Sequence, residues 1–102
     1  MRDLIVAREI LNQLGGHKFI VMVGAFNLAG DDNFLQFSFK GCSKYNKCRI
    51  ELEPNDTYKF MLYKFHKFPN VVDFEPLVNL SYIYFDQLTG IFERETGLRT
   101  SL

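Results

Sequence analysis

The sequence contains no tryptophan, only two cysteines and three prolines, and it carries no net charge. Its apolar runs, such as residues 19–23, are far shorter than the roughly 20 residues that a membrane-spanning helix needs. A helix that crosses a membrane is therefore not expected. Arg2 and Asp3 place charge where a secretory leader needs an apolar stretch, so we expect a cytoplasmic protein. In that compartment Cys42 and Cys48 are expected to be reduced thiols.

Motifs that carry chemistry are missing as well. The segment from Gly15 to Lys18 has two glycines and a lysine, but it follows an expected helix, whereas a phosphate-binding loop follows a strand and precedes a helix. A zinc site built from His66, Cys42 and Cys48 would have an unusual Cys-x5-Cys spacing and would lack a fourth ligand. We therefore expect no catalytic, cofactor-binding or metal-binding residues, and a protein that is not an enzyme.

The sequence does have the composition of one folded domain. Its 102 residues are 47% hydrophobic and 24% charged, which suits a single hydrophobic core in a domain spanning residues 1–102. The 11 phenylalanines and 5 tyrosines are more large aromatic side chains than so small a domain readily buries. We expect some of these rings to be exposed or to be covered by a partner.

The N-terminal third predicts a helix followed by a buried strand. Apolar residues recur at helical spacing from Leu4 to Leu14, and Gly15 and Gly16 favour a helix end at that point. Residues 19–23 form a nearly continuous apolar run rich in β-branched side chains, which is typical of a central strand covered on both faces.

The middle of the chain predicts three more strands joined by turns. Turn-forming residues at 29–33 precede residues 35–39, in which apolar and polar side chains alternate. The same alternation recurs at 48–52, and a turn at 54–56 leads into residues 58–65, which are apolar on both faces. Successive strands with short connections favour an antiparallel meander.

The C-terminal third predicts a helix over residues 77–96, with Gly97 as its end and Gly90 as a point where it bends or stops. The β-rich run at 82–85 leaves a strand as an alternative, and residues 71–76 are not assigned. The predicted order is α-β-β-β-β-α. We therefore expect an α+β domain whose antiparallel sheet of about four strands is packed by an N-terminal helix and a C-terminal helix.

Charge is spread unevenly although it sums to zero. Residues 34–68 contain seven basic and three acidic side chains, and in residues 58–68 lysines alternate with aromatic rings. Aromatic rings on a sheet can stack on unpaired bases while lysines and arginines neutralise phosphates. The residues that would bind single-stranded nucleic acid in this way are Lys47, Arg49, Lys59, Tyr63, Lys64, His66 and Lys67, and Lys40 and Lys44 could extend the patch.

The alternative is that the rings in residues 58–65 belong to the core and that the lysines only protect an edge strand from pairing with other chains. The alternation of side chains along the strand distinguishes these two hypotheses. Lys59, Tyr63 and Lys67 share one face of a regular strand, and Lys64 and His66 share the other. Because one face must be buried, both sets cannot lie on an open face unless a bulge reorients the strand.

Three segments carry a resemblance to known sequences: residues 5–20 (IVAREILNQLGGHKFI), 24–28 (GAFNL) and 91–102 (IFERETGLRTSL). They resemble a family of short, uncharacterised proteins encoded by bacteriophages, prophages and other mobile elements. The resemblance covers both ends of the chain, while residues 34–76 match only in their strand pattern. It implies a mobile-element origin and a host-cell cytoplasmic location, and it supplies no catalytic residues.

Two hypotheses follow for the function. The first is a small phage or mobile-element protein that acts as a non-enzymatic protein-binding module, with itself as a homodimer or with a host factor, for example as an inhibitor of a host defence system. It rests on the excess of aromatic residues and on the resemblance. The second is single-stranded nucleic-acid binding by a basic, aromatic sheet face.

Overall fold

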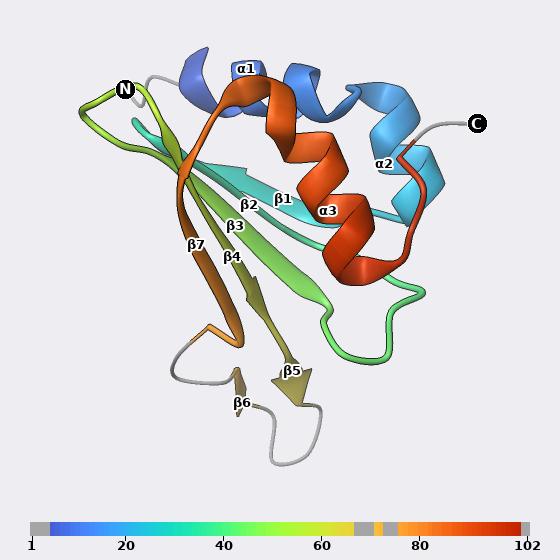
Figure 1. Cartoon of the computed structure of the whole chain (residues 1–102). Helices are drawn as coiled ribbons and strands as arrows, with labels where there is room; N and C mark the ends of the chain where they lie inside the picture. Colours follow the sequence, from blue (N-terminus) through green and yellow to red (C-terminus); the bar gives the residue numbers. More distant parts are fainter. Residues whose placement is uncertain (1–4, 67–70, 73–75, 101–102) are drawn as a thin grey trace.

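The computed structural model describes residues 5–66, 71–72 and 76–100, which form three α-helices and two antiparallel sheets (Figure 1). The helices are α1 (Ile5–Leu14), α2 (His17–Val23) and α3 (Leu88–Thr96), and a 3-10 turn, η1 (Phe85–Gln87), precedes α3. The large sheet contains β1 (Phe26–Gly30), β2 (Phe34–Ser38), β3 (Lys47–Leu52), β4 (Tyr58–Tyr63) and β7 (Val78–Ile83). The small sheet contains β5 (Phe65–His66) and β6 (Val71–Val72). The predicted α+β class is confirmed.

The large sheet is an up-and-down meander in the order β1-β2-β3-β4-β7, and every neighbouring pair is antiparallel. The central pairs are regular: β2 pairs with β3 from Phe34 opposite Glu51 to Ser38 opposite Lys47. In such a meander the β1–β2 and β3–β4 turns lie at one end of the sheet, and the β2–β3 loop and the end of β4 lie at the other. This separation of the two ends matters for the site.

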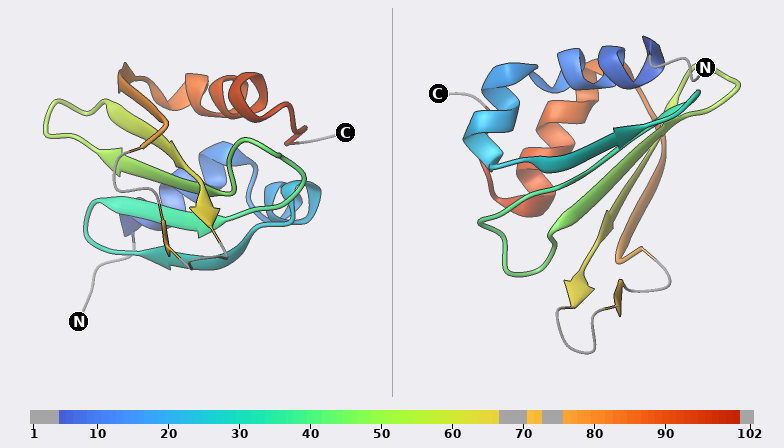
Figure 2. Two further views of the ribbon diagram at one scale, coloured as in Figure 1. Left: turned by 90° about the horizontal axis from the view of Figure 1, so that it is seen from below. Right: turned by 180° about the vertical axis from the view of Figure 1, so that it is seen from behind.

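All three helices lie on one side of the large sheet (Figure 1). The β5–β6 hairpin continues from the end of β4 and projects on the side away from the helices, as the two further views in Figure 2 show. No described helix covers that second face of the large sheet, which we call the open face. The domain therefore has two layers, helices on sheet, with the core between them.

Aromatic rings from both layers form the centre of the core. Phe19 of α2 makes edge-on contacts with Phe37 of β2 and Phe92 of α3, with ring centroids 5.3 Å and 5.2 Å apart. Phe39, just after β2, meets Phe92 at 5.2 Å. All four rings are at most 1% exposed. Edge-to-face pairs of this kind add to the stabilisation that comes from burial alone.

The first helix forms as the sequence predicts. Ala7, Ile10 and Leu14 are buried along one stripe of α1. The N–H groups of Gly15 and Gly16 both donate to the carbonyl of Leu11, which ends the helix at the predicted glycine pair.

Residues 19–23 form part of helix α2, so the predicted central strand is wrong. Phe19 and Val23, four positions apart, are both buried, while Val21 between them is 65% exposed. That pattern buries one helical stripe and would not suit a strand covered on both faces. Gly16 and Gly24, with φ of 64° and 65°, turn the chain at the two ends of α2. Packing of Phe19 into the ring cluster therefore outweighs the β-propensity of the segment.

The predicted helix over residues 77–96 is wrong in its first half, which is strand β7. Val78, Leu80 and Ile83 are the partly buried apolar residues that pack against the core, and Tyr82 has a φ of 59° that interrupts the alternation. The pairing of β4 with β7 shifts at the same place. The bulge changes a spacing of two into a spacing of three, which looks helical in the sequence. Helix α3 ends at Gly97, as predicted, but it does not stop at Gly90, which lies inside the helix.

The large sheet has five strands and not four. Strand β1 was not predicted because Asn27, with a φ of 53°, and a register shift between Phe26 and Ala29 disturb its alternation. Strand β4 ends at Tyr63, earlier than predicted, and the chain continues into the small sheet. The unassigned stretch 71–76 contains β6.

Candidate nucleic-acid interface

The open face consists of every second residue of the central strands. The residues between them, such as Phe37, Cys48 and Phe60, are completely buried against the helices. Strand register places the open-face side chains side by side in three rows across the sheet. The rows are Ser38, Lys47 and Tyr63; Gln36, Arg49, Met61 and Asn79; and Phe34, Glu51 and Lys59.

Arg49 lies at the centre of this face and is held by three neighbours. Its Nε donates to Oε1 of Glu51 at 2.8 Å, and a terminal nitrogen donates to Oε1 of Gln36 at 3.2 Å. Its guanidinium carbon lies 3.8 Å from the ring centroid of Phe34. The guanidinium therefore covers a ring, while the side chain stays 30% exposed. A guanidinium fixed in this way offers a flat surface on which a base can stack.

Tyr63 and Met61 extend the face onto β4. The Tyr63 hydroxyl donates a weak hydrogen bond to the Met61 sulfur at 3.5 Å, and Met61 is only 5% exposed. Tyr63 itself is half-buried and lies opposite Lys47 in the register of β3 and β4. A ring beside a cation is the combination that single-strand binding surfaces use.

Four lysines gather where the β2–β3 loop meets the end of β4, and we call this the basic end. Lys40 and Lys44 belong to the loop, Lys47 begins β3, and Lys64 follows β4. The Lys64 Nζ donates to the carbonyl of Ser43 at 3.3 Å, which ties the end of β4 to the loop. The loop, residues 39–46, contains no acidic residue. The described loop and the ends of β3 and β4 beside it therefore carry only positive charges.

A pocket of about 390 Å³ opens at the basic end. The Nζ of Lys40 lies 5.4 Å from the ring centroid of Phe26, within the range of a cation–π contact. None of the lining residues is acidic, so the pocket suits an anionic group such as a phosphate. The lining residues are Phe26, Asn27, Ser38, Phe39, Lys40, Asn46 and Lys47.

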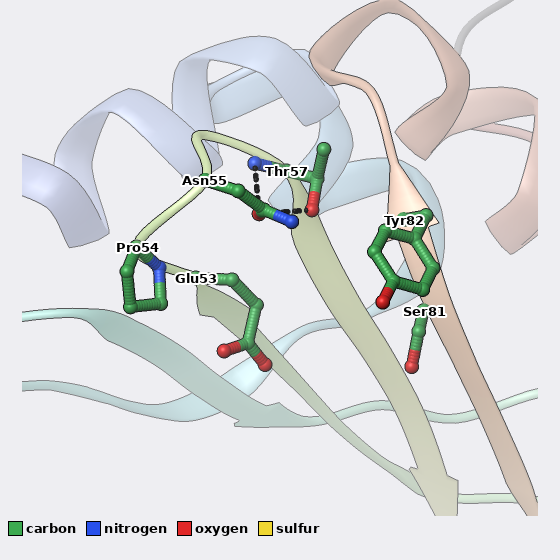
Figure 3. A pocket seen from close by; sticks show the side chains of 6 residues that line it. All are labelled: Glu53, Pro54, Asn55, Thr57, Ser81 and Tyr82. Atoms are coloured by element: carbon green, nitrogen blue, oxygen red, sulfur yellow. Dashed lines mark hydrogen bonds between the residues drawn. The ribbon is translucent and has the colours of Figure 1, made fainter.

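The opposite end of the sheet is acidic. The β1–β2 turn carries Asp31 and Asp32, and the β3–β4 turn carries Glu53 and Asp56. A second pocket, of about 340 Å³, lies between the β3–β4 turn and β7 (Figure 3). The protein is neutral as a whole, but its sheet is polarised between the two ends. Such a distribution attracts a polyanion to the basic end in preference to the acidic one.

The structure brings together four of the residues that the sequence singled out for nucleic-acid binding. Lys47, Arg49, Lys59 and Tyr63 share the open face. Lys64 lies just beyond β4, at the basic end. The remaining two predicted residues are placed less fully: the backbone of His66 belongs to β5 but its side chain is not described, and Lys67 lies outside the described residues.

Phe34 and Gln36 contact the Arg49 side chain and were not predicted as part of the site. The signal was present in the alternation of β2, because Phe34 and Gln36 have the same parity and both face away from the buried Leu35 and Phe37. Their contact with Arg49 depends on the pairing of β2 with β3, which sequence alternation does not specify.

Among the described residues, no group of three histidine, cysteine, aspartate or glutamate side chains is placed to hold a metal ion. None of the helices in this part of the chain is long and apolar enough to cross a membrane. Complete burial raises the pKa of the Cys48 thiol, which keeps it protonated.

No protein-family model matches the chain, and neither a curated protein nor a solved structure matches it. The resemblance to mobile-element proteins therefore stays a prediction. The candidate site rests on the geometry of the sheet alone.

Proposed function

We propose that this protein binds single-stranded nucleic acid on the open face of its large sheet. The observation that carries the proposal is the placement of Lys47, Arg49, Lys59 and Tyr63 together on the face that the helices leave free. Strand parity pairs Lys47 with Arg49 and Lys59 with Tyr63, but it does not say whether the two pairs lie on the same face of the sheet. Their shared orientation favours a binding surface over a set of core residues and scattered edge lysines.

The chemistry of the face fits a single strand better than a duplex. The Tyr63 ring and the guanidinium of Arg49 are flat groups in adjacent rows, and unpaired bases can stack on them. The lysines of the basic end lie beside the Tyr63 row and can neutralise phosphates. A duplex would present its phosphates and keep its bases stacked on one another, so the rings would gain nothing from it.

The test is a fluorescence anisotropy titration with short labelled oligonucleotides at several salt concentrations. Lys47→Gln combined with Lys64→Gln should weaken binding of all sequences and reduce the slope of log affinity against log salt by about 1.4, because each lost phosphate contact in a single strand removes about 0.7. A matched control, Arg8→Gln with Lys18→Gln, removes the same charge from exposed positions on α1 and α2. No binding at low salt, or an equal effect of the two double variants, contradicts the proposal.

A second candidate is the protein-binding role, with a second copy of the chain or a host factor, such as a defence component, as the partner. Exposed apolar side chains on the edge strand β7 and directly before and after it support this role: Leu77 is 55% exposed, Tyr82 72%, Tyr84 59% and Phe85 61%. Large exposed aromatic side chains are frequent in protein interfaces. An edge strand also offers unpaired backbone groups to a partner strand.

Light scattering coupled to size-exclusion chromatography tests the homodimer form of this candidate. A dimer that dissociates when Tyr84→Ser and Phe85→Ser are combined would support it. A protein that stays monomeric at all concentrations contradicts the homodimer hypothesis. A pull-down from host lysate, with the same double variant as control, then tests the hypothesis of a host partner.

A further inference from the structure

We propose that the pocket between the β3–β4 turn and β7 binds a guanine base of the bound strand. The inference rests on the proposed nucleic-acid function and gives it a sequence preference. The pocket measures about 340 Å³, within the range of small-molecule sites. Figure 3 shows the side chains of the turn on one side and those of Ser81 and Tyr82 on the other.

Asn55 presents a hydrogen-bond donor to this pocket. Its Oδ1 accepts from the backbone N–H of Thr57 at 3.2 Å and from the Thr57 hydroxyl at 2.6 Å (Figure 3). A backbone N–H can only donate, so the amide oxygen must face Thr57 and the orientation of the amide is fixed. The Nδ2 group is then left as a donor, and no hydrogen bond joins it to another described residue.

Glu53 presents two acceptors. The backbone of the turn is held by hydrogen bonds from Glu53 N to Thr57 O at 2.8 Å and from Asp56 N to Glu53 O at 3.0 Å. The carboxylate itself forms no ion pair or hydrogen bond with another residue in the described part of the chain. It is therefore a half-buried carboxylate on a fixed backbone, available to a ligand.

Tyr82 supplies a ring in an uncommon backbone conformation. Its φ of 59° lies in the left-handed region, which tyrosine seldom adopts, and its side chain remains 72% exposed. The conformation belongs to the bulge in the β4–β7 pairing, which lets Ile83 pack against the core and leaves the Tyr82 ring exposed beside the pocket. Bulges are frequent beside functional sites, where they redirect a side chain. A ring held at the mouth of the pocket can stack on a base that enters it.

The pattern of one amide donor beside two carboxylate acceptors matches guanine. Guanine offers two adjacent donors, N1–H and the 2-amino group, to the carboxylate, and its O6 accepts from an amide. Adenine, cytosine and thymine each offer a single donor on that edge, so a carboxylate oxygen would face a lone pair. Lys59 does not line the pocket, but it lies on the open face of β4, the strand that pairs with both β3 and β7, and can neutralise a phosphate of the bound strand.

The test compares labelled oligothymidines that carry one central guanine, inosine, adenine or no substitution, by anisotropy at fixed salt. Inosine lacks only the 2-amino group. We expect the guanine strand to bind at least about 5-fold more tightly than the inosine strand, which is the lower end of what a bidentate base contact contributes. Glu53→Gln should abolish this preference and leave the affinity for plain oligothymidine unchanged or slightly higher. Asp32→Asn, at the same end of the sheet, is the matched charge control and should keep the preference.

Asn55→Asp provides a second variant that keeps the turn. Its carboxylate can still accept from Thr57, but it replaces the Nδ2 donor by an acceptor, so the guanine preference should also be lost. Equal affinity for all four strands, or a preference that survives Glu53→Gln, overturns the guanine site while the proposed function stands. If no oligonucleotide binds, both fail. If free guanosine monophosphate binds more tightly than the guanine strand, the pocket is a site for a free nucleotide. The proposal that it binds a base of a bound strand is then overturned.

Discussion

On strand β3, Cys48 and Ile50 face the helices and are completely buried, whereas Lys47, Arg49 and Glu51 face away and are half-buried. Both sets belong to the same six residues, so local backbone geometry does not distinguish them. The face under the helices is dominated by close ring contacts, and the open face carries cations, hydrogen bonds and a few rings. Stability therefore depends mainly on the covered face of this sheet, which leaves the other face free to carry a function.

The largest effect is expected from removing a ring of the covered face. Phe37→Ala should lower the free energy of unfolding by about 3–5 kcal/mol, because it leaves a cavity among closely packed rings. Gln36→Ala, its neighbour on the open face, removes only the hydrogen bond from Arg49 and should cost about 1 kcal/mol or less. Urea unfolding of both variants measures the difference. Equal losses would mean that the open face also contributes to the core.

A smaller change in stability is expected from glycine substitutions in and directly after α3, one of the helices that cover one face of the sheet. Gly97 has a φ of 75°, so Gly97→Ala should destabilise the protein by about 1 kcal/mol through backbone strain. Gly90 lies inside α3, and apart from its chain neighbours and the backbone of its own helix no atom lies within 4 Å of an added Cβ, so Gly90→Ala should stabilise the protein by up to about 1 kcal/mol. Thermal unfolding measured by circular dichroism at 222 nm compares them. Shifts of the same sign would contradict the assigned end of α3.

The smallest effect concerns pH, and it also comes from the covered face. Burial raises the pKa of the Cys48 thiol and of the Tyr58 hydroxyl, so the folded state favours their protonated forms. Their contribution to stability is complete below pH 9, near the ordinary thiol pKa of 9.0, and is lost as the pH rises further. The free energy of unfolding should therefore fall above pH 9. Cys48→Ala should flatten this decline between pH 9 and 10, although it lowers stability at neutral pH.

Part of the candidate site follows from strand parity in the sequence. Lys59 and Tyr63 share a face because they are separated by an even number of residues, and Lys47 and Arg49 do so for the same reason. Parity does not reveal which face the helices cover. The contact of Arg49 with Phe34 and the pocket beside Tyr82 each join separate strands, so their register had to be known first.

Sequence patterns were enough to predict the α+β class, helix α1 with its glycine end, the alternating strands β2 and β3, and the basic character of the middle of the chain. These features depend on local periodicity and on the conformational freedom of glycine. Three features depend on tertiary packing: residues 19–23 are helical, β7 completes the sheet, and the cations of β3 and β4 face away from the core. Each of these depends on which surface is buried by residues distant in sequence, and burial of large apolar side chains outweighs the smaller differences in local propensity.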